Sequence, residues 1–387
     1  MSGTALFTRA FGLLTIAHFF SALGYASMIL LPLYLDHLGA SRAEIGAIMA
    51  CAAIGGLASR PFVGWALDSL GRRPTLIVGT LLSIAGLVGI GLVEDTGMLV
   101  YAIRVIFGMG AGTVFTGYFT FASDIVPLDR RTEGIAIFGV AGLVPLIVNP
   151  ISSLVGIEGA DVQWFLPLVG AGVVISIPFL LAVPEPRAAE DRPPLTLRAV
   201  MSSLSARPLI SVWFASVIFS GCVNIYMSFA TVIASKNAVV MPTALWFTYA
   251  GGAVFVRIFG ARIPDRVGPA RIVAPALTAY ASAFLIASHS TGDLGFLGSG
   301  LMAGIGHGYC FPVLTSLVVS RISEEHRGSG VAMFTALWGI SSLVFSPLFG
   351  SLADHTDDQM MFWVAAAMAG IAMIQWRVLE RRYGETA

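Results

Sequence analysis

The feature that most constrains this chain is a series of apolar stretches, each about as long as a lipid bilayer is thick. A helix that crosses a bilayer needs roughly 20 mainly apolar residues. Twelve such stretches follow one another with short connections, and this pattern predicts twelve membrane-spanning helices. We place them at residues 9–35, 43–67, 75–93, 97–122, 133–157, 164–183, 208–233, 244–263, 271–289, 294–320, 330–353 and 359–379.

The composition favours a membrane protein and excludes several other classes. Of the 387 residues, 56% are hydrophobic and 11% are charged, whereas soluble domains carry roughly 25% charged residues. The net charge is zero, so we expect no nucleic-acid partner. The short connections leave no room for a nucleotide-binding domain or for the added domain of a sensor. No nucleophile or acid–base pair converges in the apolar stretches, so we expect a protein that is not an enzyme.

The cysteines indicate neither disulfides nor metal binding. Cys51, Cys222 and Cys310 lie far apart, each within an apolar stretch, and without metal-ligand spacing. We interpret them as small apolar packing residues, and we expect no metal and no cofactor.

One polar stretch, Pro184–Pro208, is longer than any other and divides the apolar stretches into two groups of six. We therefore predict an all-α integral membrane protein with an N-terminal six-helix bundle at 1–183 and a C-terminal six-helix bundle at 208–387. The segment between them, 184–207, is predicted to be a cytoplasmic linker.

The arginines predict the orientation, because lysine and arginine accumulate in cytoplasmic connections. With the N-terminus placed inside, every inner connection carries arginine, whereas the outer loops hold only Arg42 and Lys236. This asymmetry alternates through every loop. It predicts a multi-pass protein of the inner (plasma) membrane with both termini in the cytoplasm.

The two halves of the chain also repeat in sequence, with three motifs in the same order and at nearly the same spacing. Parallel six-helix repeats of this kind place a substrate site between the halves, near the middle of the membrane. The motifs are Arg60, Asp68 and Gly71, matched by Arg257, Asp265 and Gly268; Gly108, Gly110 and Gly112, matched by Gly304, Gly306 and Gly308; and Arg131 with Gly134, matched by Arg327 with Gly330.

The connection after the second stretch reads Gly64-Trp-Ala-Leu67-Asp68-Ser-Leu-Gly71-Arg72-Arg73. It resembles the signature loop of the major facilitator superfamily, G-x-L-x-D-x-x-G-R-R/K. The resemblance implies two pseudo-symmetric six-helix bundles and secondary active transport by alternating access, usually by a monomer. In that family the loop locks the inner gate, which implies gating roles for Asp68, Gly71 and Arg72, with Asp124 as a partner. We add Arg60, near the inner end of its helix, to this gating set.

Two more segments are similar to the drug- and metabolite-exporter branch of that superfamily. Arg104-Val-Ile-Phe107-Gly108-Met-Gly110-Ala-Gly112 resembles a motif linked to proton-coupled movement, with Phe107 where glutamine is usual. The fifth stretch keeps Pro150 but replaces the glycines of an element typical of proton-driven drug exporters. We still expect this stretch to bend. The resemblance therefore implies a proton-coupled exporter, although these departures set the chain apart from drug antiporters.

The charged residues inside the apolar stretches are the strongest indication of a substrate class. Ionisable side chains are costly in a bilayer and are candidates for function. Every aspartate and glutamate can be placed in a connection or at a helix end, whereas five basic or titratable side chains fall inside apolar stretches. A cavity lined by cations favours an anionic solute and repels lipophilic cations. The five residues are His18, Arg60, Arg104, Arg257 and His307.

Arg104 is the main candidate for substrate binding. It lies about seven residues into the fourth stretch, roughly 10 Å from the helix start, and its repeat-related position is Gly300. The alternative is a structural arginine that holds backbone carbonyl groups. For Arg60 and Arg257, the alternative is hydrogen bonding to carbonyls at the ends of their helices.

The remaining candidates are polar or titratable residues on other helices. We predict that Tyr25, Asn224, Tyr226 and His307 contribute to substrate binding. Histidine exchanges a proton near neutral pH, so His18 or His307 is predicted to carry the coupling proton. For each residue the alternative is ordinary helix packing.

Together these patterns predict a secondary active transporter in the lipid bilayer. We expect it to export a small organic anion or zwitterion, such as a metallophore or a carboxylated metabolite, with protons as the coupling ion. The alternatives are a multidrug:proton antiporter and an importer of the same kind of anion.

Overall fold

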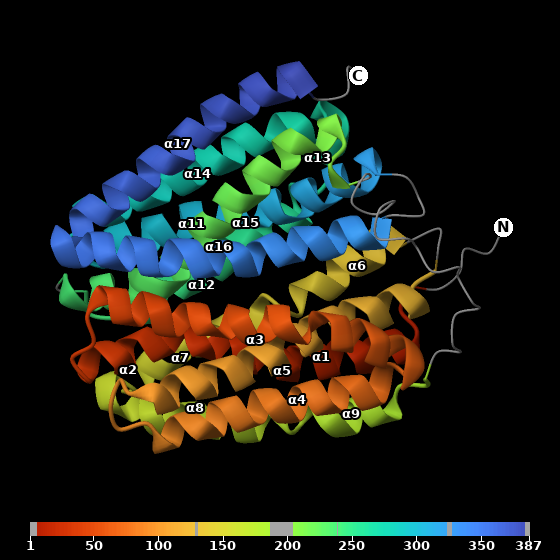
Figure 1. Ribbon diagram of the computed structural model, residues 1–387, viewed down its shortest axis with the longest axis horizontal. Helices are drawn as coiled ribbons and strands as arrows, with labels where there is room; N and C mark the ends of the chain where they lie inside the picture. Colours follow the sequence, from red (N-terminus) through yellow and green to blue (C-terminus); the bar gives the residue numbers. More distant parts are fainter. Residues whose placement is uncertain (1–5, 128–130, 186–203, 238, 323–326, 384–387) are drawn as a thin grey trace. The chain divides into compact units, whose positions relative to one another are not determined.

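The computed structural model of the chain describes residues 6–127, 131–185, 204–237, 239–322 and 327–383. Within these ranges every regular element is helical, as the apolar pattern predicts. The described residues form two compact units (Figure 1). The second half of the chain makes up the second unit together with Ser41–Ala47, and the rest of the first half makes up the first unit. Most of the predicted linker, at 186–203, lies outside the described residues.

The first unit contains the helices of the first half, drawn red to yellow-green in Figure 1. α1 packs against α8 and α9, and α4 packs against α5 and α8. A 3-10 turn at Met28–Leu30 separates α1 from α2, and Pro32 lies in the first turn of α2. The helices are α1 (Arg9–Ser27), α2 (Leu31–His37), α3 (Arg42–Ser69), α4 (Arg72–Gly89), α5 (Met98–Ile125), α6 (Arg131–Val140), α7 (Val148–Leu154), α8 (Val162–Val173) and α9 (Ser176–Ala182).

The second unit contains the helices of the second half. α15 packs against both α12 and α14, and α14 lies beside α17 (Figure 1). Large apolar side chains such as Phe247 and Ile374 remain exposed, as lipid-facing helices require. The helices are α11 (Ile210–Lys236), α12 (Leu245–Ile258), α13 (Ile263–Val267), α14 (Ala270–His289), α15 (Asp293–Arg321), α16 (Arg327–His355) and α17 (Asp358–Tyr383).

Eleven helical segments of the described chain are long and apolar enough to cross a membrane. They correspond to eleven of the twelve predicted spans. The exception is the segment predicted at 244–263, where α12 has 14 residues and is followed by a turn and the short α13. Gly260 lies in this turn, and Pro264 lies in the first turn of α13, a position that proline favours. The apolar run therefore continues through residues that do not continue the helix.

The predicted bend in the fifth stretch is confirmed. α6 ends at Val140, a 3-10 turn follows at Val144–Ile147, and α7 begins at Val148. Pro145 lies in the 3-10 turn. Because proline lacks a backbone N–H and clashes with the preceding turn, the α-helical hydrogen bonds do not continue through this point.

The sequence repeat is also a structural repeat. Gly71, before α4, has φ of 102°, and the repeat-related Gly268, before α14, has φ of 92°. Residues with a side chain rarely adopt such angles, so glycine is required at both turns.

The glycine motifs of α5 and α15 make equivalent contacts in the two units. A Cβ atom on Gly108 would lie 1.8 Å from the carbonyl oxygen of Ala52 in α3, and one on Gly304 would lie 2.1 Å from that of Tyr249 in α12. Both distances are too short for any side chain. The repeated glycines therefore let two helices of each unit approach at backbone distance, as small residues do in membrane helices.

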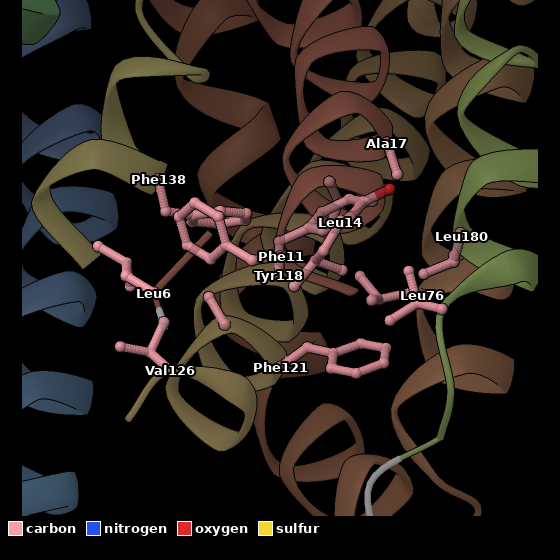
Figure 2. Packing of buried hydrophobic residues seen from close by; sticks show 13 residues of the cluster. Leu6, Phe11, Leu14, Ala17, Leu76, Tyr118, Phe121, Val126, Phe138 and Leu180 are labelled. Atoms are coloured by element: carbon pink, nitrogen blue, oxygen red, sulfur yellow. The ribbon is translucent and has the colours of Figure 1, made fainter. Parts of the chain in front are cut away.

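A buried hydrophobic cluster holds the end of the first unit at which α1 begins and α5 ends (Figure 2). Phe11 and Phe138 form an edge-to-face pair, with ring centroids 6.4 Å apart. This cluster fixes α1, α4, α5, α6 and α9 relative to one another. Its members are Leu6, Phe11, Leu14, Ala17, Leu76, Val114, Tyr118, Phe121, Ala122, Val126, Phe138, Leu180 and Val183.

Candidate functional site

Three of the predicted gating residues, Asp68, Arg72 and Asp124, form an ion-pair cluster at one end of the first unit. Gly71 turns the chain between α3 and α4 and so places Arg72 in the first turn of α4. Arg72 Nη1 lies 2.8 Å from Asp68 Oδ1, and Arg72 Nε lies 2.9 Å from Asp124 Oδ2. One guanidinium therefore joins the ends of α3 and α5. The structure brings together Asp68, Gly71, Arg72 and Asp124 as the sequence pattern suggests.

Glu185 is a further member of this cluster that the sequence analysis missed. Its carboxylate accepts hydrogen bonds from the backbone N–H groups of Arg72 and Arg73, the latter at 3.1 Å. It therefore caps the N-terminus of α4, where a negative charge is favourable. Glu185 lies in the segment assigned to the linker, and its distance in sequence from Arg72 gave no indication that the two residues are in contact.

Arg60, the remaining residue of the predicted gating set, lies about two helical turns before Asp68 on α3 and is half-buried.

Arg104 is buried between α5 and α3, with 4% of its surface exposed. Its Nη2 donates to the carbonyl oxygen of Met49 at 2.9 Å, and its Nε donates to that of Ile48 at 3.3 Å. Nη1 is buried and has no hydrogen-bond partner among the described residues. Arg104 thus binds backbone carbonyls, as expected if it is a structural arginine. Its Nη1 also remains available as a donor.

Glycines explain how Arg104 reaches the backbone of α3. A Cβ atom on Gly55 would lie 2.0 Å from the carbonyl oxygen of Val105, the residue after Arg104, so α3 and α5 approach closely beside the arginine. At this separation the guanidinium reaches the carbonyl oxygens of Ile48 and Met49 on that helix.

His18 and Tyr25 lie together on α1. The His18 ring has no exposed surface and stacks on Phe138, with centroids 4.5 Å apart. Phe138 belongs to the cluster in Figure 2. His18 Nε2 lies 3.3 Å from the Tyr25 hydroxyl, while Nδ1 is buried without a hydrogen-bond partner among the described residues. The structure therefore pairs a predicted proton site with a predicted substrate residue, in a closed aromatic setting.

His307 lies in the second unit and is less enclosed. Its exposed fraction is 7%, and its Nδ1 is hydrogen-bonded to the hydroxyl of Tyr249. That hydroxyl lies 3.1 Å from the hydroxyl of Tyr280. The three side chains form a hydrogen-bonded chain across α12, α14 and α15, a network that sequence spacing did not reveal.

Arg257, the repeat partner of Arg60, lies near the end of α12. Its guanidinium carbon is 6.0 Å from the centroid of the Phe311 ring, a distance at which cation and ring attract. Its Nε is buried and has no hydrogen-bond partner in the described part of the chain. Like Arg104 in the first unit, Arg257 therefore has a buried nitrogen that makes no hydrogen bond within the described part of the chain.

Asn224 and Tyr226 occupy different environments on α11. Asn224 is half-buried, and its Nδ2 donates to the carbonyl oxygen of Ser220 at 2.8 Å. Tyr226 is completely buried, and its hydroxyl lies 2.9 Å from that of Ser299. Tyr226 therefore lies in the core of the second unit, where its hydroxyl already has a partner.

The acidic residues lie where the sequence pattern placed them. Within the described helices, every aspartate and glutamate is within four residues of a helix end. The described residues also contain no group of three or more potential metal ligands. The interior of each unit therefore offers guanidinium, imidazole and hydroxyl groups. Guanidinium groups of this kind can bind an anion.

Comparison with known proteins identifies the family of the chain. The profile of the Major Facilitator Superfamily matches residues 14–272 and 235–386. An uncharacterized MFS-type transporter of Salmonella typhimurium is 27% identical over 383 residues, which are 92% of this chain and 92% of that protein. Quinolone resistance protein NorA of Staphylococcus aureus is 20% identical over 355 residues, which are 89% of this chain and 90% of NorA.

Solved structures with similar folds are also transporters. A mutant of the nucleoside transporter NupG has a TM-score of 0.79 and 15% identity, with 96% of this chain and 99% of NupG covered. A mutant of the peptide transporter POT has a TM-score of 0.79 and 13% identity, with 98% and 96% covered. At these identities the likeness concerns the fold alone.

Proposed function

We propose a substrate class from the premise that this chain belongs to the Major Facilitator Superfamily and is therefore a multi-pass membrane transporter rather than an enzyme. The proposed substrate is a small organic anion or zwitterion. A carboxylated metabolite or a metallophore has the required charge. We further propose that the substrate is exported by alternating access in exchange for protons, and that a monomer in the inner membrane does this work.

One observation carries the proposal. Arg104 Nη1 and Arg257 Nε are both buried without a hydrogen-bond partner among the described residues. A buried guanidinium with an unused donor favours a carboxylate or phosphate ligand. The acidic residues, which would compete for these donors or attract a cation, are confined to helix ends in the described helices.

The arginine asymmetry supports the proposed orientation, with both termini in the cytoplasm. A fluorescent protein fused to the C-terminus should therefore fluoresce in cells, because it folds in the cytoplasm. A dark fusion at normal expression would reverse the assignment.

A second candidate function is multidrug:proton antiport. The likeness to NorA, whose name records quinolone resistance, favours it. Import of an organic anion is a variant of the first proposal, because the same movement of two units serves either direction. The two main candidates differ in the charge of the substrate, which a binding screen measures directly.

The test is a ligand-induced thermal shift of the purified protein. Carboxylated metabolites and metallophores form one panel, and lipophilic cationic drugs form the other. We expect anions to raise the melting temperature, and we expect Arg104→Ala to weaken their binding by about tenfold or more, since a charge-assisted hydrogen bond is worth about 1.5–3 kcal/mol.

Two further variants separate binding from folding. Arg377→Ala removes an exposed positive charge near the end of α17 and should leave affinity unchanged. Arg104→Lys keeps the charge but loses the planar fork, and should give an intermediate affinity. Normal anion affinity in Arg104→Ala would make Arg104 structural. Stabilisation by cations alone would favour the multidrug antiporter.

A further inference from the structure

A basic cavity lies at one end of the second unit, away from the residues discussed above. It has a volume of about 480 Å³ and is lined by Arg207, Ile210, Arg382 and Tyr383. Arg207 begins the 3-10 turn that leads into α11, and the other two polar residues end α17. Two chain segments that are far apart in sequence therefore place two guanidinium groups around one cavity.

The carboxylate of Glu380, two residues before Arg382, is already engaged. Glu380 forms an ion pair with Arg321 and accepts a hydrogen bond from the Ser211 hydroxyl at 2.8 Å. Arg321 also donates to the carbonyl oxygen of Pro208 at 2.8 Å. This network joins the start of α11 to the ends of α15 and α17, so it fixes the walls of the cavity. Arg207 and Arg382 are exposed, while the partner of Glu380 in its ion pair is Arg321.

The cavity lies at the edge of the apolar zone. One candidate membrane span begins at Arg207, and another ends at Tyr383. Ile210, which is 40% exposed, supplies an apolar wall on the side of the span. The Arg382 guanidinium carbon lies 5.3 Å from the centroid of the Tyr383 ring. Charge, aromatic ring and aliphatic wall together match the boundary between phosphate groups and acyl chains.

We propose that this cavity binds the phosphodiester headgroup of an anionic phospholipid. The two guanidinium groups bind the phosphate oxygens, for which their planar donors are suited. Ile210 contacts the first part of an acyl chain. Basic pockets between membrane helices on the cytoplasmic side recognise lipid headgroups in this way. Free phosphate shares the charged part of this chemistry but does not use the apolar wall.

Native mass spectrometry of the full-length, delipidated protein tests the proposal. Phosphatidylglycerol, cardiolipin, phosphatidylcholine and inorganic phosphate are titrated separately. We expect saturable binding of the two anionic lipids, and binding about tenfold weaker in the double variant Arg207→Ala, Arg382→Ala, because both phosphate contacts are lost. Phosphatidylcholine and inorganic phosphate should bind at least about tenfold more weakly than the anionic lipids to the unchanged protein.

Arg271→Ala is the matched control. Arg271 is exposed near the start of α14 and follows Ala270, whose carbonyl oxygen accepts a hydrogen bond from Trp376 of α17. It is therefore an arginine at the same end of the unit but outside the cavity. Its removal should leave lipid binding within about twofold of the unchanged protein. Equal weakening in the control and the double variant would overturn the proposal, because diffuse charge attraction would then explain the binding.

Two other results would also overturn it. Inorganic phosphate that binds as tightly as the lipids, with the same loss in the double variant, would assign the cavity to free phosphate. A photoreactive phosphatidylglycerol on the unchanged protein should attach near Ile210 or Tyr383, and attachment elsewhere alone would exclude this site. The last measurement does not depend on the folding of any variant.

Discussion

Buried polar side chains in this protein differ in whether the protein itself completes their hydrogen bonds. The hydroxyl of Tyr226 has a hydrogen-bond partner in the protein, because it pairs with that of Ser299. Arg104, Arg257 and His18 each keep one buried nitrogen without a partner among the described residues. Leaving such a group unpaired costs about 1–3 kcal/mol. The residues with an unpaired nitrogen are therefore the better candidates for binding a ligand, and Tyr226 is the better candidate for a packing role.

The surroundings of the two histidines lead us to expect proton coupling at His307 and not at His18. Each histidine has a tyrosine hydroxyl as a partner, but His307 keeps 7% exposure, whereas His18 is fully enclosed and stacked on Phe138. A charged imidazolium is costly without access to water or a counter-charge. We therefore expect His307→Gln to slow transport driven by a pH gradient by about tenfold or more, and His18→Gln to retain most of it. The measurement is uptake into proteoliposomes with and without an imposed gradient. Loss of coupling in His18→Gln alone would reverse the assignment.

At the scale of helices, glycine decides how closely neighbours pack. Gly108 and Gly304 lie against backbone carbonyls in their respective units, so the same contact occurs twice. The sequence repeat predicted that the two glycine motifs are equivalent, and the structure shows which helices they contact. The short α12 was not predicted, because the apolar composition continues beyond Ile258 although the helix ends there.

Two glycine substitutions test this contact. Gly108→Ala would place a Cβ atom 1.8 Å from the carbonyl oxygen of Ala52, and overpacking of this kind costs about 1–3 kcal/mol or more. We expect a clear fall in the melting temperature of the purified protein. Gly64→Ala is the control, because no atom lies within 4 Å of its added Cβ. It should melt at or slightly above the unchanged temperature, since alanine favours helix. Equal melting of both variants would mean that α3 and α5 do not pack as described.

At the scale of the whole molecule, transport by alternating access requires two units that change their arrangement. The division between the two described units falls within α3. Ser41–Ala47 belongs to the second unit, and the chain from Ile48 onward belongs to the first. The cluster of Asp68, Arg72 and Asp124 lies at the opposite end of α3 from that division. Its ion pairs hold the ends of α3, α4 and α5 together.

The gating proposal predicts a separation of rate from affinity. Asp68→Asn removes one of the two carboxylates paired with Arg72. We expect transport to slow by about tenfold, because a gate acts on the movement between states, while ligand binding measured by thermal shift stays unchanged. The repeat-related Asp265→Asn lies outside this cluster and serves as the control. Weakened binding in a folded Asp68→Asn variant would exclude a purely gating role.

The sequence by itself determined the helical class, eleven of the spanning segments, the repeat and the signature loop. The helical class and the spans follow from local composition and periodicity, which depend on what a bilayer accepts over roughly 20 residues. The repeat and the signature loop follow from matching residue motifs. Tertiary structure alone decided that Glu185 caps α4, that Arg104 binds carbonyls of α3, and that Tyr226 is paired with Ser299. Such contacts join residues from different helices. They depend on which face of each helix meets its neighbour and on how closely glycine lets the two helices approach. Hydrophobic periodicity cannot supply this information when nearly every face of a helix is apolar.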